Sequence, residues 1–330
     1  MTHQRTGTIA ATPPFDFAHT LAFLSAFPPT ADEQAIDAQR LTKAVIVDDV
    51  PLAFTLRASG TTDAPQLAYT LYTDTPLGPT RIEAALDRIG FFLGLTDDLR
   101  PFYAIGATDP AFAPVQAQLY GYHQAKFLTP FENACWAILT QRNPLPQARR
   151  AKETLIARYG GGITVDGRRY DAFPEAARLA AVAPDELIAL VGNARRGTYL
   201  HAAASAFAAV DEGWLRAGPI AEVEGWLRAI KGIGAWSAAF ILIRGLGRAE
   251  ILPLGEERLA AIVARRYLGG AAATDEAIAR CAAPYGPWRG YWAHYLRVGR
   301  MIRHRATGGW YNGDVALSPP LSPIDHSPGE

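Results

Sequence analysis

The character of the sequence changes near residue 129, and this change restricts the chain to an architecture of two parts. Between residues 13 and 128, short runs of β-branched and aromatic residues at 44–47, 52–56 and 66–72 are bounded by Gly, Asp, Thr or Pro, which is typical of antiparallel strands. All seven tryptophans and the long helical periods follow residue 129. We therefore expect an α+β fold, in which an antiparallel sheet with one or two helices precedes an all-α bundle with short loops.

Spacings of three and four between apolar residues place the helices. Ile82, Leu86 and Ile89 share one face of a helix that we expect to pack across the sheet. The helices are expected at 80–93, 131–143, 148–159, 174–183, 184–191, 194–212, 221–229, 234–246, 256–267, 275–285 and 288–304. The ends at 1–12 and 317–330 lack an apolar period and are expected to be flexible, which leaves a sheet domain at 13–128 and a helical domain at 129–316.

Charge and cysteine content narrow the classes of function. The 32 Lys and Arg side chains balance the 32 Asp and Glu side chains, so no strong overall field draws the chain to a polyanion or a membrane. Residues 131–330 nevertheless hold 24 basic and 19 acidic side chains, a local bias toward anions. Only two cysteines are present, which excludes a four-thiolate metal site and a disulfide framework. The most apolar stretch, 235–243, is too short to span a bilayer, and no secretory signal is recognisable, so we expect a cytoplasmic protein. We also expect a monomer.

The densest motif lies at 227–238, where two glycines flank one apolar residue between two helical patterns. In this motif, Gly232, Ile233 and Gly234 predict a tight turn whose backbone N–H groups point outward at the start of the second helix. Such a turn can bind a phosphate, because unpaired N–H donors and the helix dipole both favour an anion. A plain corner between two helices, with glycine for close packing, explains the same pattern.

The elements around this turn carry a family resemblance. Glu256 follows Trp236 by twenty positions at the expected start of a helix, and the element 287–291 opens another helix. With the segments 13–17, 23–24, 130–132 and 138–141, the order and spacing resemble helix-hairpin-helix (HhH-GPD) DNA glycosylases of the 3-methyladenine DNA glycosylase II branch. The resemblance implies a TATA-binding-protein-like N-terminal sheet, followed by a helix-hairpin-helix bundle in two subdomains with a base pocket between them.

The resemblance also implies a reaction and a partner. Such enzymes hydrolyse the N-glycosidic bond of a damaged base, here most simply an alkylated purine, flipped out of double-stranded DNA. A lone carboxylate suits this chemistry, because it stabilises the positive charge that develops on the sugar and can orient water. Family members that also nick the strand carry a lysine where this chain has Trp236, so we expect a monofunctional enzyme, associated with the nucleoid when it binds DNA.

The catalytic position departs from the family pattern. The family carries aspartate there, whereas this chain has Glu256, whose extra methylene moves the carboxylate by about 1.3–1.5 Å, a displacement that can lower a rate ~10²-fold. Three accounts stay open: a pocket shaped for glutamate, replacement by Glu257, or a catalytically silent DNA-binding protein. Glu256 could also be an ordinary carboxylate in the first turn of a helix.

The resemblance assigns the base pocket to aromatic side chains, of which this chain keeps a part. Phe23, Trp236 and Phe240 could stack on a flipped base, although a large aromatic such as Trp236 is often a core residue. Glu257 and Arg297 replace aromatic residues of the pattern and make the pocket more polar. They could also pair with each other or face solvent.

The remaining assignments concern contacts with DNA. Arg142 and Asn143 are candidates for a side chain that fills the gap left by the flipped nucleotide, or for an exposed loop. Arg195, Arg196 and Arg289 could support phosphate contacts, or be merely solvated. At the hairpin, the DNA-binding residues implied are Lys231, Gly232, Ile233, Gly234, Ala235 and Ser237. No cofactor and no metal ligand from side chains are expected, while the resemblance permits a monovalent cation on the hairpin backbone when DNA is bound.

Overall fold

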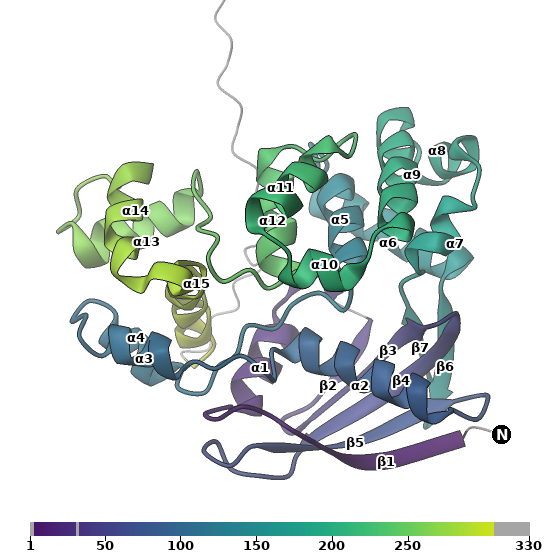
Figure 1. Ribbon diagram of the computed structural model, residues 1–330, viewed down its shortest axis with the longest axis horizontal. Helices are drawn as coiled ribbons and strands as arrows, with labels where there is room; N and C mark the ends of the chain where they lie inside the picture. Colours follow the sequence, from purple (N-terminus) through teal and green to yellow (C-terminus); the bar gives the residue numbers. More distant parts are fainter. Residues whose placement is uncertain (1–2, 31–32, 307–330) are drawn as a thin grey trace, which may run out of the picture.

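A five-stranded antiparallel sheet forms the N-terminal part of the computed structural model, which describes residues 3–30 and 33–306 (Figure 1). Its strands are β1 (His3–Ala10), β2 (Gln34–Ile36), β3 (Arg40–Val47), β4 (Val50–Ala58) and β5 (Gln66–Thr73), in the order β1-β5-β4-β3-β2. The predicted strands at 44–47, 52–56 and 66–72 are confirmed within β3, β4 and β5.

The prediction of a flexible N-terminus is wrong for residues 3–10. These residues form β1 and pair with β5 in a continuous register from His3 opposite Thr73 to Ala10 opposite Gln66. The strand is largely exposed, so its sequence lacks an apolar period, and it is held by ladder hydrogen bonds of the backbone instead. The predicted tail at 317–330 lies outside the described residues.

The two faces of the sheet are covered by different elements, because side chains alternate along a strand. Leu52, Phe54 and Leu56 of β4 point into the main core. The same core includes Ile89 and Phe92 of helix α2 (Pro79–Leu93), which confirms the predicted helix at 80–93. On the opposite face, a smaller cluster joins the sheet to two further strands; its buried members are Ala44, Ala53, Ile163, Val165, Tyr170 and Ala172.

These two further strands correct the expectation of an all-α second part. Helix α6 (Leu145–Tyr159) ends where the predicted helix at 148–159 ends, but β6 (Gly161–Val165) and β7 (Arg168–Ala172) then form a hairpin. Asp166 and Gly167 make its turn with φ of 50° and 77°, a pair of left-handed conformations that suits a two-residue hairpin loop. The hairpin packs back on the sheet and so ties the second part to the first.

The remaining elements are helices; those at 17–25, 100–106, 113–118 and 212–217 are not among the predicted helices, and the others overlap predicted ones. They are α1 (Phe17–Ser25), α3 (Arg100–Gly106), α4 (Ala113–Gln118), α5 (Pro130–Leu139), α7 (Ala176–Ala180), α8 (Pro184–Val191), α9 (Ala194–Ala209), α10 (Glu212–Ala217), α11 (Ile220–Ala229), α12 (Ala235–Arg244), α13 (Glu257–Tyr267), α14 (Asp275–Ala282) and α15 (Arg289–Ala306), with short 3₁₀ turns at η1 (Pro28–Thr30) and η2 (Ala283–Trp288). Helices α5 to α12 lie above the sheet, and α13 to α15 gather with α3 and α4 to one side (Figure 1). Within the described part of the chain, no helix is both long and apolar enough to cross a membrane.

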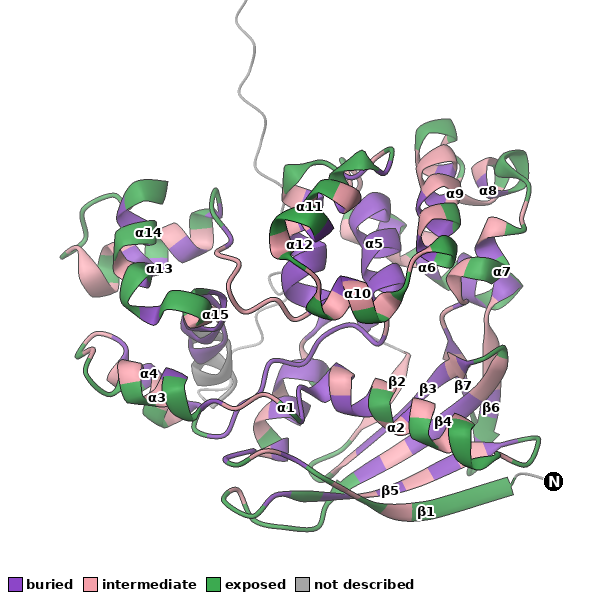
Figure 2. Cartoon of the chain, viewed as in Figure 1, coloured by how far each residue is buried: buried purple, intermediate pink, exposed green. Residues whose placement is uncertain are grey.

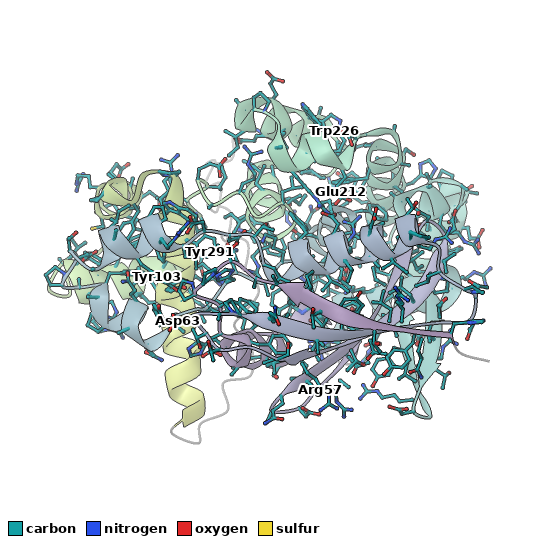
Figure 3. All side chains as sticks on the ribbon, turned by 60° about the horizontal axis from the view of Figure 1, so that its bottom comes forward. Arg57, Asp63, Tyr103, Glu212, Trp226 and Tyr291 are labelled. Atoms are coloured by element: carbon teal, nitrogen blue, oxygen red, sulfur yellow. The ribbon has the colours of Figure 1, made fainter. Side chains whose placement is uncertain are left out.

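Two interior features fix the positions of these groups of helices. Helix α5 is buried along its whole length between α9 and α12 (Figure 2), and its Glu132 accepts a hydrogen bond of 2.7 Å from the buried Lys152. Lys152 also pairs with Glu33 of the sheet domain. On the other side, Tyr103 of α3 and Tyr291 of α15 belong to an aromatic cluster between these two helices, in which Tyr295 contacts both rings (Figure 3). The loop from α12 to α13 connects these two groups of helices.

Candidate active site

Glu256 lies directly before α13 and turns its side chain into the protein, with 7% of the side chain exposed. Its Oε1 lies 3.2 Å from Nε of Arg297 on α15, while Oε2 is buried without a hydrogen-bond partner among the described residues. The side chain makes no capping bond to its own helix. Glu256 is therefore the buried N-cap residue of α13 and does not stand in its first turn, where Glu257 lies.

Burial and the neighbouring arginines shift the pKa of Glu256 in opposite directions. Burial raises the pKa of Glu256, because the ionised carboxylate loses its hydration, while the positive charges of Arg297 and Arg258 oppose this shift. One carboxylate oxygen is thus held by a cation and the other is unpaired. Such a group can stabilise a developing positive charge or orient a water molecule.

The pairing proposed for Glu257 and Arg297 is corrected by this geometry. Glu257 is the first residue of α13 and is exposed, so its side chain lies outside the buried group around Glu256. Arg297, with 16% of its side chain exposed, pairs with Glu256 instead. The two neighbouring carboxylates therefore differ in burial and in partner, which makes them a natural test pair.

The aromatic residues assigned to the base pocket do not all surround one space; they lie in a row, each ring in contact with the next. Trp236 is partly buried and stacks on Phe240, with ring centres 5.4 Å apart and 22° between the planes. Phe23 on α1 lies further along, because Phe127 and Phe27 connect it to Phe240. Trp236 and Phe240 are thus brought together, and Phe23 belongs to the adjoining group.

Arg244, which lies at the inner end of this row of rings, was not among the predicted site residues. It is the last residue of α12, is only 4% exposed, and lies 4.9 Å from the ring centres of both Phe23 and Phe27. A signal was present, because positions 236, 240 and 244 recur every four residues and form one stripe of the helix.

His294 and Tyr122, also missed, lie beside this group. Nε2 of His294 and the Tyr122 hydroxyl are 3.0 Å apart, and the His294 ring meets Phe23 edge-on. Burial lowers the pKa of His294, and the positive charges of Arg244 and Arg297 lower it further. His294 is therefore neutral at physiological pH.

The glycine hairpin is held rigidly, with an exposed outer surface. Gly232 has φ of +96°, and a Cβ there would lie 2.3 Å from Cγ of Tyr199, so both its conformation and its surroundings require glycine. Its carbonyl accepts a hydrogen bond of 2.7 Å from Nε2 of Gln141. Gly234 is the N-cap of α12, with open space around its Cβ position.

The other hairpin residues divide into buried and exposed ones. Ile233 and Ser237 are buried and anchor the turn from inside. Lys231 and Ala235 are exposed on its outer surface together with Gly234. The exposed N-terminus of α12 can therefore accept an anion.

The structure separates the two candidates in the loop after α5. Nδ2 of Asn143 donates to the carbonyl of Leu139 at 2.9 Å, so Asn143 closes the helix end. Arg142 is exposed and has φ of +46°, and Arg196 donates to its carbonyl at 3.5 Å. Arg142 is thus the side chain that this loop presents outward.

The remaining arginines are placed less specifically. Arg195 is exposed at the start of α9. Nε of Arg289 donates to the carbonyl of Glu250 at 2.5 Å, which holds the start of α15 against the α12–α13 loop. Among the residues whose side chains the structure describes, 3–30 and 33–299, no cluster of His, Cys, Asp or Glu could hold a metal ion.

Comparison with known proteins places this geometry in context. Over 224 residues, 67% of this chain and 74% of the relative, the chain is 26% identical to the DNA-3-methyladenine glycosylase of Bacillus subtilis (strain 168). The 3-methyladenine DNA glycosylase from Archaeoglobus fulgidus superimposes with a TM-score of 0.73 at 17% identity, over 91% of this chain and 98% of that one. The chain has the fold of a DNA glycosylase.

Two further comparisons set the limits of this assignment. No family model matches the chain. An 8-oxoguanine glycosylase/lyase from Clostridium acetobutylicum shares the fold, with a TM-score of 0.62 at 13% identity over 90% of this chain and 98% of that one. A DNA-glycosylase fold therefore accommodates more than one base and more than one mechanism, and the residues of the site must decide between them.

Proposed function

We propose that the protein is a monofunctional DNA glycosylase, which hydrolyses the N-glycosidic bond of a modified purine flipped out of double-stranded DNA. The observation that carries this proposal is the side chain of Glu256, buried at the start of α13, with one oxygen held by Arg297 and the other unpaired. The relative named DNA-3-methyladenine glycosylase supports a modified, in particular an alkylated, purine as substrate.

The reaction follows from the charge of this group. As the bond between the base and the sugar breaks, positive charge develops on the deoxyribose, and the Glu256 carboxylate stabilises it. The unpaired Oε2 is available to orient the attacking water and to accept its proton. The ion pair with Arg297 favours the ionised carboxylate, against the effect of burial, and fixes its position.

The choice of water as nucleophile rests on Trp236. A glycosylase/lyase uses an amine that forms a Schiff base with the sugar, and an indole ring cannot supply one. Trp236 is instead packed against Phe240, while the hairpin lysine, Lys231, is exposed on the outer surface. We therefore propose that the enzyme leaves an abasic site without cutting the strand.

The surface around the site supports a mode of DNA binding. We propose that the exposed hairpin, Lys231 to Ala235, binds a backbone phosphate, with a monovalent cation on its carbonyls in the DNA-bound state, and that Ser237 supports the turn from within. Arg142, in its exposed loop, would fill the gap left by the flipped nucleotide. The protein would act as a monomer at the nucleoid.

Base release from defined duplexes tests the proposal. Duplexes with one 3-methyladenine, 7-methylguanine, 1,N6-ethenoadenine or hypoxanthine are incubated with the protein, and hot alkali then reveals abasic sites. We expect cleavage only after alkali, and no adduct trapped by borohydride. Binding of these duplexes without any base release would favour the silent DNA-binding protein, and a trapped adduct would contradict the monofunctional mechanism.

A further inference from the structure

Arg244 is a buried cation without a counter-charge. Neither Nη1 nor Nη2 has a hydrogen-bond partner among the described residues, although both nitrogens are fully buried. Burial lowers the pKa of Arg244 to about 10, so the guanidinium remains charged at neutral pH. An unpaired buried charge is expensive, and native proteins retain one where a ligand or a reaction uses it.

The charged groups around Arg244 leave an excess of positive charge. Lys126 lies 3.6 Å from Asp97, and Arg297 lies 3.2 Å from Glu256, so each of these cations has its own carboxylate. The other titratable groups that face Arg244 are the hydroxyls of Tyr122 and Tyr291 and the neutral imidazole of His294. Arg244 is the third cation, and the described residues offer it no carboxylate.

The position of Arg244 connects this charge to the proposed site. It continues the stripe of α12 that carries Trp236 and Phe240, two turns beyond the phosphate-binding hairpin. The ring of Phe23, a residue that could stack on a base, is centred 4.9 Å from its guanidinium. The positive charge of Arg297, the partner of Glu256, contributes to the lowered pKa of Arg244.

We propose that Arg244 binds the acceptor edge of the flipped base and stabilises the negative charge of the leaving group, so that release of a neutral modified purine depends on Arg244 and release of a cationic one does not. This inference rests on the proposed glycosylase function and specifies its substrate class. A planar guanidinium suits the O6 and N7 acceptors of a purine such as hypoxanthine.

The charges balance along the reaction. The bond between C1′ and N9 breaks heterolytically, and its electron pair remains on the purine, whose anion is stabilised by the N–H donors of Arg244. Glu256 stabilises the cationic sugar, the oxygen of water bonds to C1′, and the proton released from water reaches the purine by way of the Glu256 carboxylate. A cationic purine such as 7-methylguanine departs as a neutral molecule and does not need this assistance.

Hypoxanthine and 7-methylguanine provide the test: both carry O6, but 7-methylguanine carries a positive charge and its methylated N7 cannot accept a hydrogen bond. We would measure single-turnover release of each base by the wild-type protein and by Arg244→Met and Arg244→Lys, with melting temperature and affinity for abasic-site DNA as controls. We expect Arg244→Met to slow release of hypoxanthine by about 10²- to 10³-fold and release of 7-methylguanine by less than about tenfold. Arg244→Lys keeps the positive charge but loses the planar pair of N–H donors. Its rate of hypoxanthine release should therefore lie between those of the wild type and Arg244→Met.

Several outcomes would overturn the inference. Release of 7-methylguanine but not of hypoxanthine by the wild type would contradict it and leave the proposed glycosylase function standing. An equal loss on both duplexes, whether or not the melting temperature falls, would assign Arg244 a merely structural role; if Arg244→Met does not fold, the same ratio is measured with Arg244→Lys. Failure of the wild type to release any base from any duplex would instead reject the proposed function.

Discussion

Glu256 and Arg297 form an ion pair between the start of α13 and the middle of α15, with 3.2 Å between Oε1 and Nε. Each of these residues departs from the family pattern to which the sequence is similar, where aspartate and tryptophan are expected. The structure shows that the two departures contact each other. The longer acid and the arginine are therefore best understood as one combined change, in which the carboxylate reaches a new partner.

The first prediction concerns the length of the acid. Glu256→Asp shortens the side chain by about 1.3–1.5 Å, so its carboxylate should lose Arg297 and lower the single-turnover rate of base release by roughly 10²-fold. Glu257→Asp, in the exposed neighbour, should leave the rate unchanged. An aspartate variant as fast as the wild type would show that the pair does not position the acid.

The second prediction concerns pH. Because burial raises the pKa of Glu256 and catalysis needs the ionised form, the rate should be low in acid and rise as the pH passes through this pKa. Arg297 favours the ionised form, so Arg297→Met should raise the pKa further and move the acid limb of the rate profile to higher pH. Arg280→Met, on an exposed position of α14, serves as control. If the acid limb of Arg297→Met lies at the same pH as that of the wild type, Arg297 does not influence the ionisation of the catalytic carboxylate.

The third prediction separates folding from DNA binding at the hairpin. Gly232→Ala should destabilise the fold by about 1–3 kcal/mol, because it combines a left-handed φ with a clash against Tyr199. Gly234→Ala meets open space in the free protein and should leave the melting temperature unchanged. If a phosphate approaches this glycine, Gly234→Ala should weaken duplex binding by about tenfold, the loss expected for one charge-assisted hydrogen bond. Equal affinity of Gly234→Ala and the wild type would place the phosphate elsewhere.

The sequence predicted most of the longer helices, because the helical period is visible within one segment, but it missed short ones such as α3 and α4. Two kinds of strand element were also missed. Strand β1 is exposed and polar, and its partner β5 lies some 60 residues away in the chain, so no local pattern reveals it. The β6–β7 hairpin did carry a local signal, the Asp166-Gly167 pair, but the surrounding helical periods concealed it.

In the candidate site, too, contacts between residues that are distant in the sequence could not be predicted. Glu256 and the hairpin were identified from order and spacing, yet neither the burial of Glu256 nor its pairing with Arg297 can be read from positions 41 residues apart. Arg244 resembles an ordinary basic residue at the end of a helix, a position that favours cations. Only the packing of α1 over α12 shows that its guanidinium is enclosed.

Base release by two matched variants tests the central claim most directly. Glu256→Gln keeps an oxygen that can accept a hydrogen bond from Arg297 but removes the negative charge, while Glu257→Gln makes the same change on the exposed neighbour. We predict that a duplex containing a modified purine yields alkali-labile sites with the wild type and with Glu257→Gln, and none above background with Glu256→Gln, at equal DNA affinity and melting temperature. Activity that survives in Glu256→Gln, or that disappears in Glu257→Gln instead, would contradict the assignment of Glu256 as the catalytic carboxylate.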